Sequence, residues 1–198
     1  MSQRKVTAAE LMAKLNAEPE FVAARQKAEA ERQQREAEWR AAETPLLEDL
    51  REAGHDLHSV WDLVNTPGSY PAAVPILLNH VDRSYPAAVR EGIARALAVP
   101  DAKIGWDLLV RLYREEQEPR VKDGLAAAIS AIADDALIHD LISLARDRQQ
   151  GPSRVLLLSA LGRSTDAQAR ASLMDLQHDD ELKKEAELIL RKLERAKR

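Results

Sequence analysis

The chain has 198 residues, of which 45% are hydrophobic; 33 acidic and 29 basic side chains give a formal charge of −4, and cysteine is absent. This composition supports a folded core and excludes global disorder, disulfides, thiolate zinc sites and thiol nucleophiles. The apolar runs are far shorter than the ~18–20 residues of a membrane span, and the first residues lack the apolar core of a signal peptide. We therefore expect a cytoplasmic protein with no membrane partner, and the acidic balance argues against nucleic acid as a partner.

Residues 1–44 are predicted to form a charged helical extension or cap. They carry eight basic side chains and eight glutamates, some spaced as helical pairs such as Arg32 and Glu36,. Pro19 is expected to open a long helix rich in Ala, Glu, Gln and Arg, which are strong helix formers. The few apolar residues expected to cover the following domain are Leu11, Leu15, Phe21 and Trp39.

Residues 45–198 contain a repeat of hydrophobic columns. A shift of 32 residues aligns Leu77, Leu109, Leu141 and Leu173, and three positions later His80, Leu112, Leu144 and Leu176. The same shift aligns a second set, Trp61, Ile93, Leu125, Leu157 and Ile189, next to the small residues Ala96, Ala128 and Ala160. Columns three or four positions apart lie on one face of a helix. Each unit is therefore predicted to contain two amphipathic helices, and no stretch alternates as a strand would.

The turn residues agree with these columns. Pro86, Pro119 and Pro152 recur every 33 residues, just before the second helix of a unit, where proline is tolerated in a first helical turn,. A two-helix unit of this length cannot enclose its own apolar face, so each unit must bury that face on its neighbours. The repeat thus predicts a solenoid domain over residues 45–198, following the extension over residues 1–44.

The segments that begin at Pro86 and Pro119 place Val89-Arg90 and Val121-Lys122 ahead of a run of small and apolar residues. They resemble the second helix of bacterial HEAT repeats of the PBS-lyase type, and the resemblance covers about residues 45–193. It implies an all-α, right-handed α-α superhelix of four to five helix pairs, whose second helices line a concave surface that commonly holds another protein. The last unit departs from the pattern, because Glu185-Ala186 stands in place of Val-Arg.

Three cations, Arg90, Lys122 and Arg154, recur 32 residues apart on the predicted second helices. In one interpretation they form a basic ladder on the concave face for an acidic partner. In the other they are the structural cations of the Val-Arg pattern. They then pair with an acidic residue at the preceding turn, for which the candidates are Asp82, Glu115 and Asp147. The residues predicted to contact a partner are Arg90, Glu91, Arg95, Lys122, Asp123 and Arg154.

The remaining residues with chemical potential do not predict an active site. His55, His139 and His178 each precede an aspartate, but HEAT-like metalloenzymes such as the deoxyhypusine hydroxylases carry paired His-Glu steps, which this chain lacks. Trp61 and Trp106 occupy hydrophobic columns, so we expect them in the core rather than in a groove. We therefore predict no catalytic residue, no cofactor and no metal site.

The sequence thus predicts a non-catalytic scaffold that binds another protein on the concave face of a HEAT-like solenoid. Two alternatives stay open. One is a HEAT-like groove enzyme, similar to DNA glycosylases or bilin lyases, which requires a carboxylate near exposed aromatic side chains. The other is an immunity protein that neutralises a basic toxin, which the compact acidic scaffold suggests.

Overall fold

The computed structural model describes residues 7–196, with the side chains of residues 9–11 and 13 left aside. Within this range the chain is all-helical, with eleven α-helices, three 3₁₀-helices and no strand, which confirms the predicted all-α class. The chain divides into two compact units, Met1–Ala41 and Ala42–Arg198.

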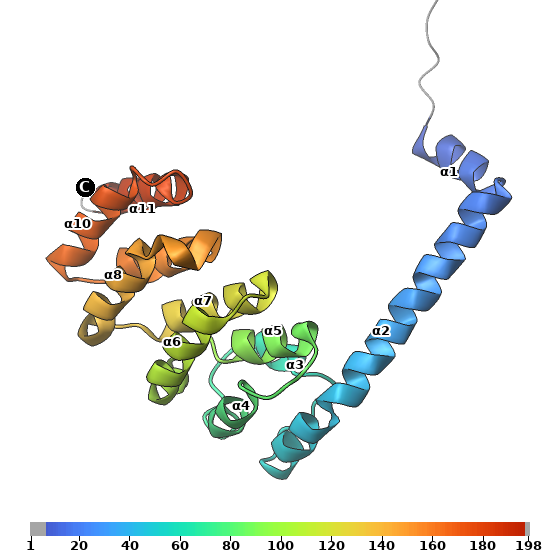
Figure 1. Cartoon of the computed structure of the whole chain (residues 1–198), viewed down its shortest axis with the longest axis horizontal. Helices are drawn as coiled ribbons and strands as arrows, with labels where there is room; N and C mark the ends of the chain where they lie inside the picture. Colours follow the sequence, from blue (N-terminus) through green and yellow to red (C-terminus); the bar gives the residue numbers. More distant parts are fainter. Residues whose placement is uncertain (1–6, 197–198) are drawn as a thin grey trace, which may run out of the picture. The chain divides into compact units, whose positions relative to one another are not determined.

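Two helices begin in the N-terminal unit, α1 (Ala8–Asn16) and α2 (Pro19–Glu52). The elements that follow in the second unit are α3 (Trp61–Val64), α4 (Val74–His80), α5 (Ala87–Ala96), η1 (Pro100–Gly105), α6 (Trp106–Glu115), α7 (Pro119–Ile132), η2 (Asp135–Leu137), α8 (Ile138–Arg146), η3 (Arg148–Leu157), α9 (Leu158–Arg163), α10 (Ala167–Leu176) and α11 (Lys183–Ala196), where η marks a 3₁₀-helix. Figure 1 shows these helices following one another in chain order across the second unit.

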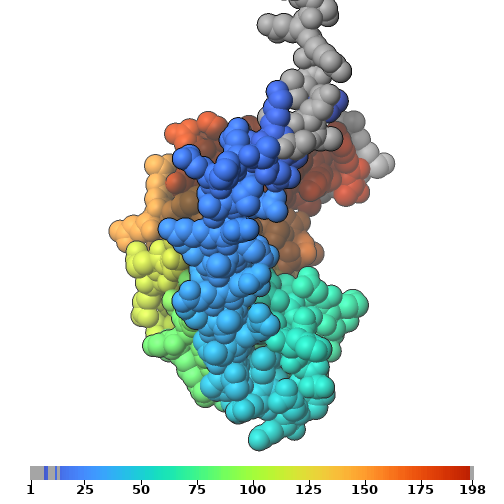
Figure 2. Space-filling model, turned by 90° about the vertical axis from the view of Figure 1, so that its right-hand side faces the viewer, coloured from blue at the N-terminus to red at the C-terminus, as the bar shows by residue number. Residues whose placement is uncertain are grey.

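Helix α2 is a single helix of 34 residues that continues through Pro45. Figure 2 shows the atoms of this segment as one column coloured from blue to cyan. The predicted boundary between residues 44 and 45 therefore does not coincide with a helix end. Pro45 has no N–H to bond to the carbonyl of Ala41, and its ring crowds that carbonyl, yet the helix is continuous through this position,. The expected pair is present, with Arg32 Nη1 3.2 Å from Glu36 Oε1. The Leu11 side chain lies outside the described residues, and the capping role of this segment stays a prediction.

The first-helix columns of the repeat lie in the core. Leu77, Leu109, Leu141 and Leu173, in α4, α6, α8 and α10, each have no exposed surface. Leu112, Leu144 and Leu176, three positions after the last three of these, are also buried. Complete burial of a leucine side chain contributes roughly 1.5–3 kcal/mol. The leucines that recur every 32 residues in the sequence are thus the residues that form the core.

The second helices approach one another through small residues. Helix α5 packs against α7, with the buried side chains of Ile93 and Leu125 at the core. A methyl group on Gly124 of α7 would lie 3.0 Å from Cβ of Ala94 and 3.2 Å from the carbonyl oxygen of Glu91, both in α5. Both separations are shorter than ordinary contacts, so glycine at this position permits the close approach of the two helices.

One column position is filled by a polar side chain. His80 of α4 stands where the following units have leucine, and it is fully buried. Its Nε2 lies 2.7 Å from Oδ2 of Asp49 in α2, and its Nδ1 lies 2.6 Å from the hydroxyl of Tyr85, on which its ring stacks. These contacts offset the cost of burying the imidazole and join the end of α2 to α4.

The recurring prolines stand at or near the start of the second helices. Pro86 directly precedes α5, and Pro119 is the first residue of α7. Pro152 lies inside η3, after Gly151, whose φ of 67° favours glycine,. The segment after Pro152 therefore begins as a 3₁₀-helix and becomes α-helical only at Leu158, unlike the α-helix that the repeat predicts there.

Substitution of Gly124 by alanine tests the close approach of α5 and α7. We expect Gly124→Ala to lower the free energy of unfolding by about 1–3 kcal/mol, although alanine gains about 1 kcal/mol in helix propensity. The new methyl group meets a backbone oxygen and another methyl group, and neither can rotate away. Chemical denaturation measures the change.

The matched control for this prediction is a double-mutant cycle with Ala94→Gly. The double variant should lose less stability than the sum of the two single variants, because removal of the Ala94 methyl group relieves part of the overlap. Additive losses, or a stabilised Gly124→Ala variant, would contradict the close packing of the two helices.

Candidate functional site

The residues predicted to contact a partner lie on α5, α7 and η3. Glu91, Arg95, Lys122 and Asp123 are partly exposed, and we call the side of α5 and α7 that they occupy the second-helix face. Arg95 follows Glu91 by one helical turn, and Asp123 occupies the position in α7 that Glu91 occupies in α5, because the two are 32 residues apart,. The structure therefore brings together four of the six predicted residues.

Arg90 forms an ion pair with a residue of the next unit. Its Nη2 donates to Oε2 of Glu116, in the turn between α6 and α7. Only 7% of the Glu116 side chain is exposed, and its Oε1 accepts hydrogen bonds from the backbone N–H groups of Gln117 and Glu118. The carboxylate thus orders the turn before α7 and ties that turn to α5,.

Lys122, the next cation of the ladder, has a different environment. Its Nζ donates to the carbonyl oxygen of Glu116 at 3.2 Å and lies 5.2 Å from the ring centre of Tyr113. Burial lowers the pKa of Lys122, and the nearby carboxylates of Glu116 and Asp147 oppose this change. The ammonium group is therefore held by a carbonyl and an aromatic ring rather than by an ion pair in the described part of the chain.

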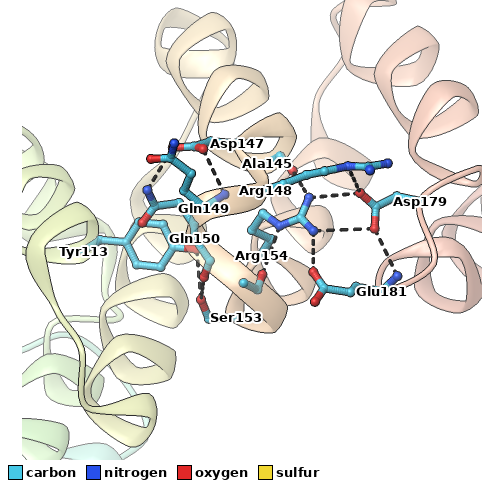
Figure 3. A network of polar contacts seen from close by, with 11 residues as sticks. Tyr113, Ala145, Asp147, Arg148, Gln149, Gln150, Ser153, Arg154, Asp179 and Glu181 are labelled. Carbon is cyan, nitrogen blue, oxygen red and sulfur yellow. Dashed lines mark hydrogen bonds and ion pairs between the residues drawn. The ribbon is translucent and has the colours of Figure 1, made fainter.

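Arg154 is the third cation of the ladder and is buried, with 1% of its side chain exposed. Its guanidinium lies between the backbone and the next unit (Figure 3). Nε donates to the carbonyl of Gly151 at 2.9 Å, and Nη1 donates to the carbonyl of Ala145 at 3.1 Å and to Asp179 at 3.2 Å. Nη2 donates to Glu181 at 2.5 Å. These hydrogen bonds use donors on all three guanidinium nitrogens, so few donors remain for a binding partner,.

The acidic partners of the ladder lie at the following turn and not at the preceding one. Arg90 pairs with Glu116, and Arg154 with Asp179 and Glu181, whereas the expected candidate Asp82 pairs with Arg111. The arginine of a second helix contacts the turn of the following repeat, because that repeat packs against the side of the helix on which the arginine lies. For Arg90 and Arg154 the structure therefore favours the structural interpretation of the ladder.

The carboxylate of Asp179 shows how strongly Arg154 is engaged. Burial by itself raises the pKa of Asp179, but hydrogen bonds from Arg154 and from the backbone N–H of Glu181 outweigh this effect, so that the pKa lies below its usual range. Arg148 Nε, 3.3 Å from Asp179 Oδ2, adds a second cation. Asp179 is therefore ionised at neutral pH despite being buried.

The charges of the second-helix face are less evenly paired. Arg95 Nε donates to Oε1 of Glu91 at 2.9 Å. Burial raises the pKa of Asp123; the charge of Arg95 opposes this shift and the charge of Glu91 adds to it. The four charges of the face sum to zero, but the Lys122 ammonium is held by the Glu116 carbonyl and the Tyr113 ring. Glu91 and Asp123 therefore share one arginine, Arg95.

A hollow of about 230 Å³ lies beside this face, between the turn before α7 and the segment around Pro152. Gln150 lines it and is only 6% exposed. The Gln150 side-chain amide donates to Asp147 at 2.8 Å, and its Oε1 is buried without a hydrogen-bond partner in the described residues. The other lining residues are Glu116, Gln117, Pro119, Lys122, Asp123, Pro152 and Ser153. Sequence reasoning missed Glu116 and Gln150, since neither falls in a repeated column.

The histidines and tryptophans give no second site. His80 is buried between Asp49 and Tyr85, and Trp106 is 7% exposed, as expected of a core residue, whereas Trp61 is half-buried. Within residues 7–196 no three His, Asp or Glu side chains lie close enough together to hold a metal ion. None of the helices in that range has both the length and the apolar composition of a membrane span.

The buried network around Arg154 predicts a large effect of its removal. We expect Arg154→Ala to lower the free energy of unfolding by about 3–5 kcal/mol, because the buried Asp179 loses its main compensating charge. Arg154→Lys should restore little of the lost stability, since one ammonium cannot reach all four acceptor groups.

The matched control is Arg146→Ala, which removes an exposed arginine that also pairs with the following repeat, through Asp175 at 2.7 Å. That variant should lose no more than about 1 kcal/mol, and denaturation curves in which both arginines have equal effects would refute the prediction.

The buried tyrosine beside this network predicts a pH dependence. Burial is the main cause that raises the pKa of Tyr113 from 10.0 to about 12. Because the folded value lies above the unfolded one, folding favours the protonated phenol. Its stabilising contribution is complete below pH 10 and is lost as the pH rises toward 12,. Tyr113→Phe should therefore show a smaller loss of stability over this alkaline range, measured by denaturation at a series of pH values. Equal alkaline losses in both proteins would show that Tyr113 is not the group responsible.

Comparisons with protein-family models, with curated proteins and with solved structures found no match for this chain. The functional interpretation therefore depends on the repeat in the sequence and on the contacts described above. Since helical-repeat folds support many unrelated functions, it must be argued from the charges and surfaces of this chain.

Proposed function

We propose that the chain is a non-catalytic HEAT-like solenoid, a right-handed α-α superhelix that binds another protein on the concave surface formed by its second helices. Two features support this proposal. The 32-residue columns of leucine are buried between consecutive helix pairs, as a stacked repeat requires,. The second helices α5 and α7 lie next to one another and expose a continuous charged face.

The carboxylate of Asp123, which lacks an ion pair in the described residues, is the observation that carries the proposal. Asp123 is half-buried and forms no ion pair in the described part of the chain, and the only nearby arginine, Arg95, is already hydrogen-bonded to Glu91. Removing a carboxylate from water without compensation costs free energy. A partner that places a cation or an N–H donor next to Asp123 provides that compensation and gains affinity and orientation from it.

The six predicted residues have different roles in this proposal. Glu91, Arg95, Lys122 and Asp123 form the contact surface itself. Arg90, with 28% of its side chain exposed, borders the surface while holding Glu116. Arg154 is buried and ties η3 to Asp179 and Glu181 of the following turn, so it is not available for a partner. We therefore expect partner binding to depend on the two half-buried carboxylates more than on the basic ladder.

Site-specific photo-cross-linking in the native cell tests the location of the partner. A photoreactive amino acid at Ala127, partly exposed one turn after Asp123 in α7, should give a discrete cross-linked adduct. The same amino acid at Ser143, exposed on the first helix α8, serves as the control and should not. Equal adducts at both positions, or an adduct only at Ser143, would place binding elsewhere.

Neutralisation of the two carboxylates tests the chemistry. Glu91→Gln combined with Asp123→Asn should weaken binding of the cross-linked partner by about tenfold or more, because the charge that attracts it is removed without a change in shape. The matched control, Asp107→Asn with Asp140→Asn, removes two exposed carboxylates from first helices and should leave the dissociation constant unchanged. A similar effect of both pairs would indicate a general charge effect and contradict the assignment to the second-helix face.

A further inference from the structure

A second surface lies on the last helix pair, away from the residues of the second-helix face. Helices α10 and α11 form a hollow of about 420 Å³ on one side. We call this side the α10–α11 face; its main lining residues are Arg170, Met174, Glu187, Leu190, Arg191 and Glu194.

In the preceding helix pair, α8 and α9, the corresponding side is covered by α10 and α11. The positions 32 residues earlier that correspond to Arg170, Met174 and Leu190 are Ile138, Ile142 and Leu158, which are 1%, 7% and 0% exposed. They are covered because α10 packs on α8 and α11 packs on α9. On α10 itself, 51% of Met174 is exposed. A flexible apolar side chain with this exposure is typical of a contact surface.

The charges of the α10–α11 face indicate what covers it. The face carries two arginines and two glutamates, which form two loose pairs: Arg170 Nη2 to Glu194 Oε1 at 3.7 Å and Arg191 Nη2 to Glu187 Oε2 at 3.8 Å. Nη1 of Arg170 is buried and has no hydrogen-bond partner in the described residues. Because both pairs are longer than a hydrogen bond, the exposed guanidinium nitrogens can still donate to an additional carboxylate,.

A surface with equal numbers of both charges around an apolar centre is complementary to a copy of itself. In a two-fold symmetric contact the same residues face one another, so each arginine of one copy can approach a glutamate of the other. A strongly acidic or strongly basic partner would instead leave two like charges opposed on this face. We propose that the α10–α11 face is a homodimer interface, in which the exposed Met174 side chains of two copies pack together and the arginine–glutamate pairs extend across the two-fold axis.

Reciprocal charge variants test this proposal in the full chain. Analytical ultracentrifugation over a concentration series should show a concentration-dependent dimer for the wild type. Arg170→Glu with Arg191→Glu gives a face with four negative charges, and Glu187→Arg with Glu194→Arg gives one with four positive charges. Each variant should self-associate at least about tenfold more weakly than the wild type, because like charges then meet at the axis. An equimolar mixture of the two should recover the dimer.

The controls separate this interface from folding and from the second-helix face. Arg114→Glu with Arg120→Glu makes the same charge change on α6 and α7 and should leave the dimer intact. Circular dichroism confirms that each variant is folded. The proposal is overturned if the wild type is a monomer at concentrations up to about 0.1 mM, corresponding to an association weaker than roughly 5 kcal/mol. It is also overturned if either charge variant dimerises as well as the wild type, or if the mixture stays monomeric. Because Ala127 and Asp123 lie outside this face, cross-linking to a partner can succeed or fail independently of dimerisation.

Discussion

A pair of short helices cannot enclose its own apolar side, and the second unit of this chain depends on that constraint. Each repeat of 32 residues presents a leucine face that only a neighbouring repeat can cover,. Leu77, Leu109, Leu141 and Leu173 become fully buried in this way. The stability of one helix pair thus depends on its contact with the next. For this reason a methyl group added at Gly124 of α7, where α7 meets α5, is expected to lower the free energy of unfolding.

The same stacking decides which charges are available for binding. Arg90 and Arg154 recur at equivalent positions, yet both are held by carboxylates of the following turn, Glu116 and Asp179. Arg95 hydrogen-bonds to Glu91, and only its charge acts on Asp123. The binding chemistry we propose therefore follows from the positions at which internal pairing is incomplete, and not from the positions at which charged residues recur.

The two proposed surfaces differ in the kind of complement that they require. On the second-helix face Asp123 has no ion pair in the described residues, which favours a partner bringing a cation or a hydrogen-bond donor. The α10–α11 face has balanced charges around Met174, which favours a copy of itself. Dimerisation through α11 leaves α5 and α7 free, so that a dimer would present two second-helix faces to its partners.

The sequence by itself determined the helix pairs and their buried columns, because the hydrophobic period of a helix is local and a 32-residue repeat needs no knowledge of contacts,. It also identified the residues of the second-helix face, since repeat register places Glu91 beside Asp123. Only the tertiary structure decided that α2 continues through Pro45, that His80 binds Asp49, and that Arg154 is buried against Asp179. The last two features depend on contacts between residues 31 and 25 positions apart in the sequence, and no local pattern encodes such contacts.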